Sequence, residues 1–145
     1  MIKDFRHVGL IVTDMDVSLK FYRDLLGLKV KSLVDEEAEF LDNMLGYENV
    51  KIKVAKLHAG NSLVELIESK SFGNKKERNF FTIGASHFAL TVDNLQKTYE
   101  YLLENNVEFT APPQLTPVDY GPEQVKVTFC KDPDGTPIEL VEVIK

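Results

Sequence analysis

The chain has 145 residues, enough for one domain with a buried core, and its 23 acidic residues against 17 lysines and arginines give a net charge of −6 that argues against a nucleic-acid partner. A single cysteine, Cys130, excludes an intramolecular disulfide and fits a reducing compartment. No apolar run approaches the roughly 20 residues that span a bilayer, so we expect a soluble cytoplasmic protein with no membrane partner.

The first half of the chain is predicted to contain four strands and two helices. A helix capped by Asp14 or Asp16 and ended by Gly27 follows the first strand, and a shorter helix ends at Gly46. The alternation of apolar and polar residues, interrupted by turn residues, places the strands. They are residues 5–12, residues 28–34, residues 50–54 and, after the turn at residues 59–61, the strand around Glu65.

The second half repeats this order after a linker at residues 70–84 that is rich in glycine, asparagine and lysine. A strand at His87 leads into a helix that we expect Asp93 to cap, with Gln96 at the capping-box position. The remaining second-half segments are a strand at residues 107–110, a loop at residues 112–117, and strands around residues 125–129 and 138–143. Each half is thus βαβββ. We predict an α+β fold in a single domain, 1–145, with modules 1–69 and 85–145.

Two short patterns occur once in each half. His7-Val8-Gly9-Leu10-Ile11-Val12 and His87-Phe88-Ala89-Leu90-Thr91-Val92 share the order His, any residue, small residue, Leu, any residue, Val. Val64-Glu65-Leu66 likewise matches Ile138-Glu139-Leu140, which follows the turn Asp132-Pro133-Asp134-Gly135. The chain therefore places two His-strands and two Glu-strands in the order His, Glu, His, Glu.

The repeated glutamates lie on apolar strand faces. Side chains alternate along a strand, so Glu65 shares its face with Leu63 and Ile67, and Glu139 shares its face with Val141. A buried carboxylate costs several kcal/mol unless a partner compensates its charge, and a metal ion is such a partner. Two imidazoles with two carboxylates suit Zn²⁺, Ni²⁺, Co²⁺, Mn²⁺ or Fe²⁺ better than Ca²⁺ or Mg²⁺.

Single residues of these types are usually structural, because a lone strand histidine is commonly hydrogen-bonded and a terminal-strand glutamate is commonly solvated. Four such residues at repeated positions favour a shared metal site of His7, Glu65, His87 and Glu139. An octahedral ion would keep two positions open for neighbouring substrate oxygens, and the small residues Gly9 and Ala89 would leave space beside it.

Three other residues are interpreted without a role in that site. Glu68 and Glu142, on the opposite strand face, are predicted to be solvent-exposed or ion-paired. Cys130 has no clear neighbouring base and is predicted to be a small core residue rather than a nucleophile.

The modules, the four candidate ligands and the Asp-Pro-Asp-Gly turn before Ile138 resemble the vicinal oxygen chelate superfamily, which includes glyoxalase I, methylmalonyl-CoA epimerase, extradiol dioxygenases and the fosfomycin and bleomycin resistance proteins. The resemblance covers nearly the whole chain. It implies a curved, cup-like mixed β-sheet with helices outside, and a homodimer. The metal site would lie within one chain or across the dimer, since the ligand order is the same in both.

The set of His7, Glu65, His87 and Glu139 is similar to the four-ligand pattern of glyoxalase I, on Zn, Ni, Co or Mn with iron less favoured. The resemblance implies a metal-dependent lyase or isomerase that acts on a small molecule with adjacent oxygens. A metal-bound enediolate would form while Glu139, with Glu65 as its counterpart, moves the α-proton.

The sequence departs from bacterial glyoxalases at two positions. Ile11 stands where they usually carry an arginine, and Ser69 lies near their usual asparagine. In those enzymes the arginine and the asparagine bind glutathione. The thiol cofactor and the substrate are therefore open. The alternatives are a methylmalonyl-CoA epimerase-like enzyme and a metabolite- or antibiotic-binding resistance protein of the same fold.

Overall fold

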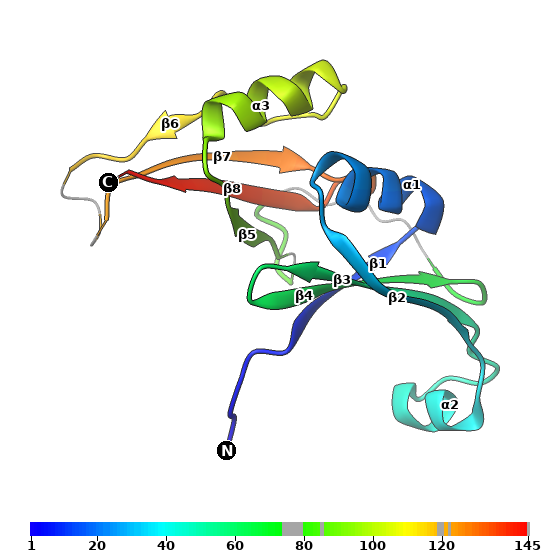
Figure 1. Cartoon of the computed structure of the whole chain (residues 1–145). Coiled ribbons are helices and arrows are strands. Elements are labelled where there is room, and N and C mark those ends of the chain that lie inside the picture. The colour runs from blue at the N-terminus through cyan, green and yellow to red at the C-terminus, as the bar shows by residue number, and fades with distance from the viewer. Residues whose placement is uncertain (74–79, 85, 119–120, 122, 145) are drawn as a thin grey trace. The chain divides into compact units, whose positions relative to one another are not determined.

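The computed structural model describes residues 1–73, 80–84, 86–118, 121 and 123–144. They form two compact units, Met1–Glu77 and Arg78–Lys145, each with one four-stranded sheet (Figure 1). Residues 74–79 of the predicted linker lie outside the described residues. None of the described helices is long and apolar enough to cross a membrane.

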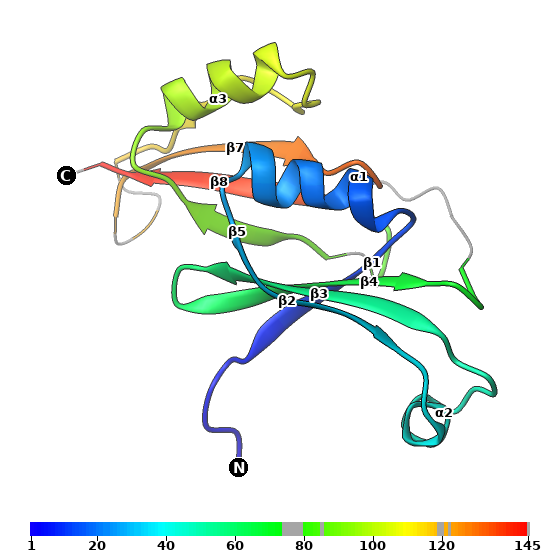
Figure 2. The same cartoon turned by 45° about the vertical axis from the view of Figure 1, so that its right-hand side comes forward.

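The first unit contains a mixed sheet in the order β1-β4-β3-β2. Strand β1 runs parallel to β4, whereas the β4–β3 and β3–β2 pairs are antiparallel, and β2, β3 and β4 lie side by side in Figure 2. The elements of the unit are β1 (His7–Val12), α1 (Met15–Leu19), the π-helical continuation η1 (Lys20–Leu25), β2 (Lys29–Glu36), α2 (Glu39–Leu45), β3 (Ile52–Ala59) and β4 (Ser62–Ser69).

The second unit repeats that order without a counterpart of α2. Its sheet has the order β5-β8-β7-β6, again with only the first pair parallel. Its elements are β5 (Phe88–Thr91), α3 (Leu95–Glu104), β6 (Gln114–Leu115), β7 (Val125–Lys131) and β8 (Pro137–Val143). The predicted α+β class with two βαβββ modules is confirmed.

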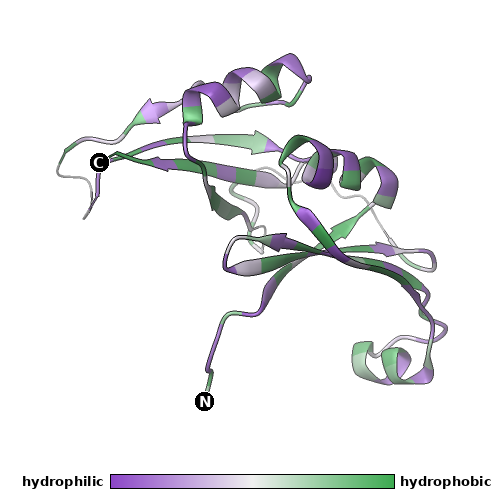
Figure 3. Cartoon of the chain, in the orientation of Figure 1, coloured by the Kyte–Doolittle hydropathy of each residue, from purple (hydrophilic) through white to green (hydrophobic). Residues whose placement is uncertain are grey.

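Helices α1 and α3 pack against the last strand of their own unit, β4 and β8 respectively, through buried apolar side chains. In the first unit Val64 and Leu66 of β4 are buried, as are Met15 of α1 and Tyr22 of its continuation η1. Ile138 and Leu140 of β8 are buried in the second unit together with Leu95 and Leu102 of α3. The mixture of polar and apolar segments along α3 in Figure 3 is typical of a helix with one buried face. The other sheet face therefore remains available for polar side chains.

A glutamate on that last strand accepts a hydrogen bond from the first turn of the helix. The Met15 amide donates to Glu68 Oε2 at 2.7 Å, and the Leu95 amide donates to Glu142 Oε2 at 2.8 Å. The prediction that Glu68 and Glu142 are exposed or ion-paired is wrong: both are half-buried. The reason is that the first N–H groups of a helix have no partner within the helix and attract a carboxylate.

The predicted helix ends and turns agree with the structure except in the second unit. Asp14 caps α1 by accepting from the Val17 amide, and Gly27 and Gly46, both with φ of 73°, follow their helices. Asn94 rather than Asp93 caps α3, since Asn94 has the extended backbone that lets its side chain accept from the Lys97 amide.

Two strand predictions in the second unit also need correction. The segment predicted as a loop, residues 112–117, contains the short strand β6, which pairs with β7. The predicted strand at residues 107–110 forms only an isolated bridge between Phe109 and Cys130. Residues 112–117 were predicted as a loop because they include three prolines, and proline is usually confined to sheet edges and turns.

We predict that Glu68→Ala and Glu142→Ala each lower the free energy of unfolding by about 1–2 kcal/mol, because each leaves a half-buried helix N–H unpaired. Urea denaturation of the variants measures the change. Exposed Glu48, replaced by alanine, is the control and should change the free energy by less than about 0.5 kcal/mol. Variants as stable as the control would show that the two carboxylates do not stabilise the helices.

Candidate metal-binding site

The first unit brings His7 and Glu65 together across the parallel pair β1–β4. In the register of this pair Gly9 lies opposite Glu65, and His7 lies opposite Leu63. His7 Nε2 is 3.6 Å from Glu65 Oε1, with the histidine side chain 33% exposed and the glutamate side chain 14% exposed. The first pair of predicted site residues is therefore adjacent.

The second unit brings His87 and Glu139 together in the same way. His87 lies one residue before β5, and Ala89 lies opposite Glu139 in the parallel pair β5–β8. His87 Nε2 is 3.3 Å from Glu139 Oε2, and the two side chains are 40% and 25% exposed. The repeated sequence patterns thus produce repeated imidazole–carboxylate pairs.

The small residue beside the first pair borders open space. A Cβ built on Gly9 would meet no atom within 4 Å, although Gly9 is the direct neighbour of Glu65 across the strands. The expectation that this position leaves room beside the two donors agrees with the structure.

Lys56 is a charged neighbour of Glu65 that the sequence patterns did not single out. It lies opposite Glu65 in the antiparallel pair β3–β4, and its Nζ is 3.2 Å from Glu65 Oε2. The hairpin turn in the sequence already pointed to this contact. Ala59 pairs with Ser62 at the turn, so the residue three positions before Ala59, Lys56, pairs with the residue three positions after Ser62, Glu65. The carboxylate of Glu65 thus has an imidazole at one oxygen and an ammonium at the other.

Aromatic rings take the corresponding place in the second unit. Phe129 lies opposite Glu139 in the β7–β8 pair, as Lys56 lies opposite Glu65. The His87 ring stacks on Phe80 with centroids 5.5 Å apart, and it meets Phe129 edge-on with centroids 5.2 Å apart. The two pairs are therefore equivalent in position but differ in their surroundings.

Neither unit by itself, over its described residues, gathers three or more His, Cys, Asp or Glu side chains that could hold a metal ion. Each unit contributes one imidazole–carboxylate pair instead. The set of four ligands stays a prediction, and it requires donors from both modules.

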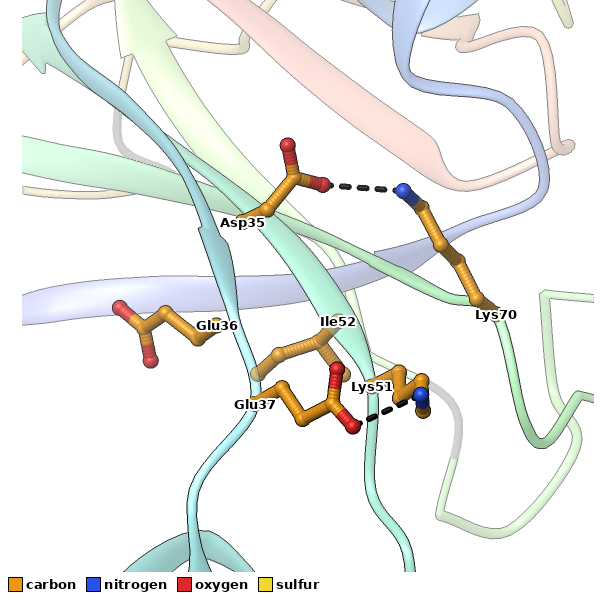
Figure 4. A pocket seen from close by; sticks show the side chains of 6 residues that line it. All are labelled: Asp35, Glu36, Glu37, Lys51, Ile52 and Lys70. Atoms are coloured by element: carbon orange, nitrogen blue, oxygen red, sulfur yellow. Dashed lines mark hydrogen bonds and ion pairs between the residues drawn. The ribbon is translucent and has the colours of Figure 1, made fainter.

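A separate pocket at one end of β2 and β3 is shown in Figure 4. Its lysines are already paired: Lys70 Nζ is 3.0 Å from Asp35 Oδ1, and Lys51 Nζ is 2.7 Å from Glu37 Oε1. The hydrogen bond from Lys70 lowers the pKa of Asp35 below its usual value. Because both of its lysines are paired with carboxylates and no histidine lines it, this pocket offers no donor set comparable to the His–Glu pairs.

The sequence matches the family model of the Glyoxalase/Bleomycin resistance protein/Dioxygenase superfamily over residues 4–140. The chain belongs to this superfamily. Members of the superfamily commonly use divalent metals, and the resemblance inferred from the sequence patterns is confirmed.

Relatives of this glyoxalase-superfamily chain match it nearly end to end. Lactoylglutathione lyase of Haemophilus influenzae is 30% identical over 137 residues, covering 94% of this chain and 90% of that protein. The Escherichia coli protein YaeR is 30% identical over 142 residues, 97% of each chain. A glyoxalase family protein from Bacillus cereus has the same fold, with a TM-score of 0.83, 17% identity, and coverage of 100% of this chain and 97% of that one.

Cys130 is a core residue, as predicted. Its side chain is fully buried on β7, and burial raises the pKa of the thiol from 9.0 to about 12. A thiol with this pKa stays protonated at neutral pH, and the thiolate is the reactive form of cysteine. Cys130 is therefore not a nucleophile of this site.

We predict that Cys130 in the folded protein does not react with a thiol reagent such as dithionitrobenzoate at pH 8, because the group is buried and protonated. Absorbance should show one thiol per chain only after addition of guanidinium chloride. The Cys130→Ala variant provides the blank. Rapid reaction of the native protein would contradict the buried, high-pKa thiol.

Proposed function

We propose that the protein is a metal-dependent lyase or isomerase of glyoxalase I type that moves a proton next to a carbonyl group. The observation that carries this proposal is the pair of equivalent imidazole–carboxylate contacts, His7 with Glu65 and His87 with Glu139. The lactoylglutathione lyase relative that matches nearly the whole chain supports it. The proposal includes a single domain, a homodimer and a cytoplasmic location.

The two pairs fit a first-row divalent ion. Imidazole and carboxylate donors bind Zn²⁺ at about 2.0–2.2 Å, so neighbouring donors of one ion stand about 3.0–3.5 Å apart. The observed separations of 3.6 Å and 3.3 Å are close to this range. Zn²⁺, Ni²⁺, Co²⁺ and Mn²⁺ suit this donor set, and Fe²⁺ is less favoured.

The four residues share one task in the proposed reaction, and Glu139 has a second. His7, Glu65, His87 and Glu139 would hold the ion, which would stabilise negative charge on adjacent substrate oxygens when bound. Glu139 takes the proton from the carbon that bears the hydroxyl group and returns it to the former carbonyl carbon, while the hydroxyl proton passes to the former carbonyl oxygen. A carboxylate in reach of both carbons can perform both transfers, since it is a base before the first and an acid after it.

Glutathione is not part of this proposal. Ile11 is 66% exposed and offers no charge to a carboxylate. The Ser69 hydroxyl is already engaged, because it accepts hydrogen bonds from the amides of Ser71 and Phe72 at 3.3 Å and 2.8 Å. The proposed substrate is a small molecule with adjacent oxygens whose thiol, if it has one, is recognised by other groups.

We predict that Glu139→Gln lowers turnover by about 10²-fold or more while the circular dichroism spectrum is unchanged, because the amide cannot accept the proton. Steady-state kinetics on the substrate that the wild type converts measures the loss. Exposed Glu123, replaced by glutamine, should leave turnover unchanged. Full activity of the Glu139 variant would rule out its role as the base.

We also predict that the purified protein binds a divalent ion and that His7→Ala and His87→Ala each weaken binding, because each removes an imidazole donor. Elemental analysis and calorimetry with Ni²⁺ or Zn²⁺ measure this. His58→Ala is the matched control, since His58 is an exposed histidine of β3. A protein that binds no divalent ion would favour a metabolite-binding role instead.

The choice between the two enzyme classes needs a substrate comparison. The hemithioacetal of methylglyoxal with glutathione, and with other thiols, tests the glyoxalase reaction. Methylmalonyl-CoA tests the epimerase reaction. Turnover of methylmalonyl-CoA alone would replace the proposed activity with the epimerase alternative while keeping the proton-transfer chemistry.

A further inference from the structure

The carboxylate of Glu65 has a different partner at each oxygen. Oε1 faces His7 Nε2 at 3.6 Å, whereas Oε2 contacts Lys56 Nζ at 3.2 Å. Lys56 therefore does not occupy the oxygen that lies beside the imidazole. The arrangement keeps Oε1 open for a further partner while the carboxylate is anchored through Oε2.

We infer that Lys56 is a positioning residue that holds Oε2 of Glu65 and so presents Oε1 to a divalent cation beside His7. The inference rests on the proposed function, because it takes this pair as metal ligands. Hydrogen bonds to the outer atoms of a ligand fix its orientation, and their loss typically weakens metal binding by about 10–100-fold. The register of β3 and β4 places Lys56 directly opposite Glu65 for this role.

A positive charge near the cation acts in the opposite direction, so the two effects must be compared. The Lys56 side chain is 38% exposed, and water therefore screens its repulsion of a cation. Glu65 is only 14% exposed, so water screens its end of the ion pair poorly and the pair holds the orientation of the carboxylate. The positioning effect outweighs the repulsion, and the net result of removing Lys56 is weaker metal binding.

The second unit has no equivalent of this anchor. Among its described residues, no lysine or arginine lies within 4 Å of the Glu139 carboxylate, and Phe129 holds the register position of Lys56. Phe80 and Phe129 instead surround His87. The first unit thus fixes its carboxylate and the second unit fixes its imidazole, which leaves Glu139 as the carboxylate that can exchange partners during proton transfer.

Calorimetric titration of the metal-free full-length protein with Ni²⁺ and Zn²⁺ tests the role of Lys56. Lys56→Met, which removes the ammonium group and its ion pair with Glu65, should weaken binding by about tenfold or more. Lys56→Gln keeps an N–H donor and should recover most of the affinity. Lys70→Met breaks an exposed lysine–aspartate pair in the same unit and should bind like the wild type.

Two further measurements separate positioning from a general structural effect. The absorption spectrum of bound Co²⁺ should change in Lys56→Met and return in Lys56→Gln, because it reports the ligands around the ion. Thermal unfolding of the metal-free variants should differ little from that of the Lys70 control. A large loss of metal-free stability in Lys56→Met alone would overturn the positioning role in favour of a structural one.

The possible results are distinguishable. Tight binding by the wild type together with equal or tighter binding by Lys56→Met would overturn this inference and leave the proposed function intact. Weak binding by both Lys56→Met and Lys56→Gln would also overturn it, since an N–H donor next to Glu65 would then not restore the orientation of the carboxylate. A wild type that binds no divalent ion would overturn both the inference and the proposed metal chemistry.

Discussion

Parallel pairing between the first and last strands of each unit is the constraint on which the candidate site depends. The β1–β4 and β5–β8 pairs set Gly9 opposite Glu65 and Ala89 opposite Glu139. Parallel strands need a crossover connection, and in each unit the intervening helical segments and two strands supply it. The residues that meet are about 60 positions apart in the first unit and about 50 in the second, so they become neighbours only after the entire module has folded.

The same strand serves both faces of its sheet. In β4, Glu65 and Glu68 are three positions apart and so project to opposite sides. Glu65 contacts His7 on the face away from the helix, and Glu68 accepts a hydrogen bond from the Met15 amide on the face that carries the helix. The helix is thereby tied to the strand that carries the proposed ligand, and β8 repeats the arrangement with Glu139 and Glu142. Helix docking and placement of the site residue are properties of one strand.

The sequence predicted those features that repeat or follow a short-range rule. The His and Glu patterns occur twice, the glycine stops end helices at Gly27 and Gly46, and the turn at Gly60 closes a hairpin. Features that depend on tertiary contact were missed. Glu68 looked like a surface residue because its partner is a backbone amide 53 positions away. Lys56 lies beyond the predicted strand at residues 50–54, and only the register of β3 and β4 places it opposite Glu65.

Lys56 and Phe129 hold equivalent places in two modules joined in one polypeptide. Covalent fusion is what permits this difference. A symmetric assembly of two identical single modules would place a lysine, or a phenylalanine, against both glutamates, and the two acids would then have the same surroundings. Tandem duplication removes that restriction, so each half of a fused pair can specialise by a single substitution while the architecture that unites them is retained.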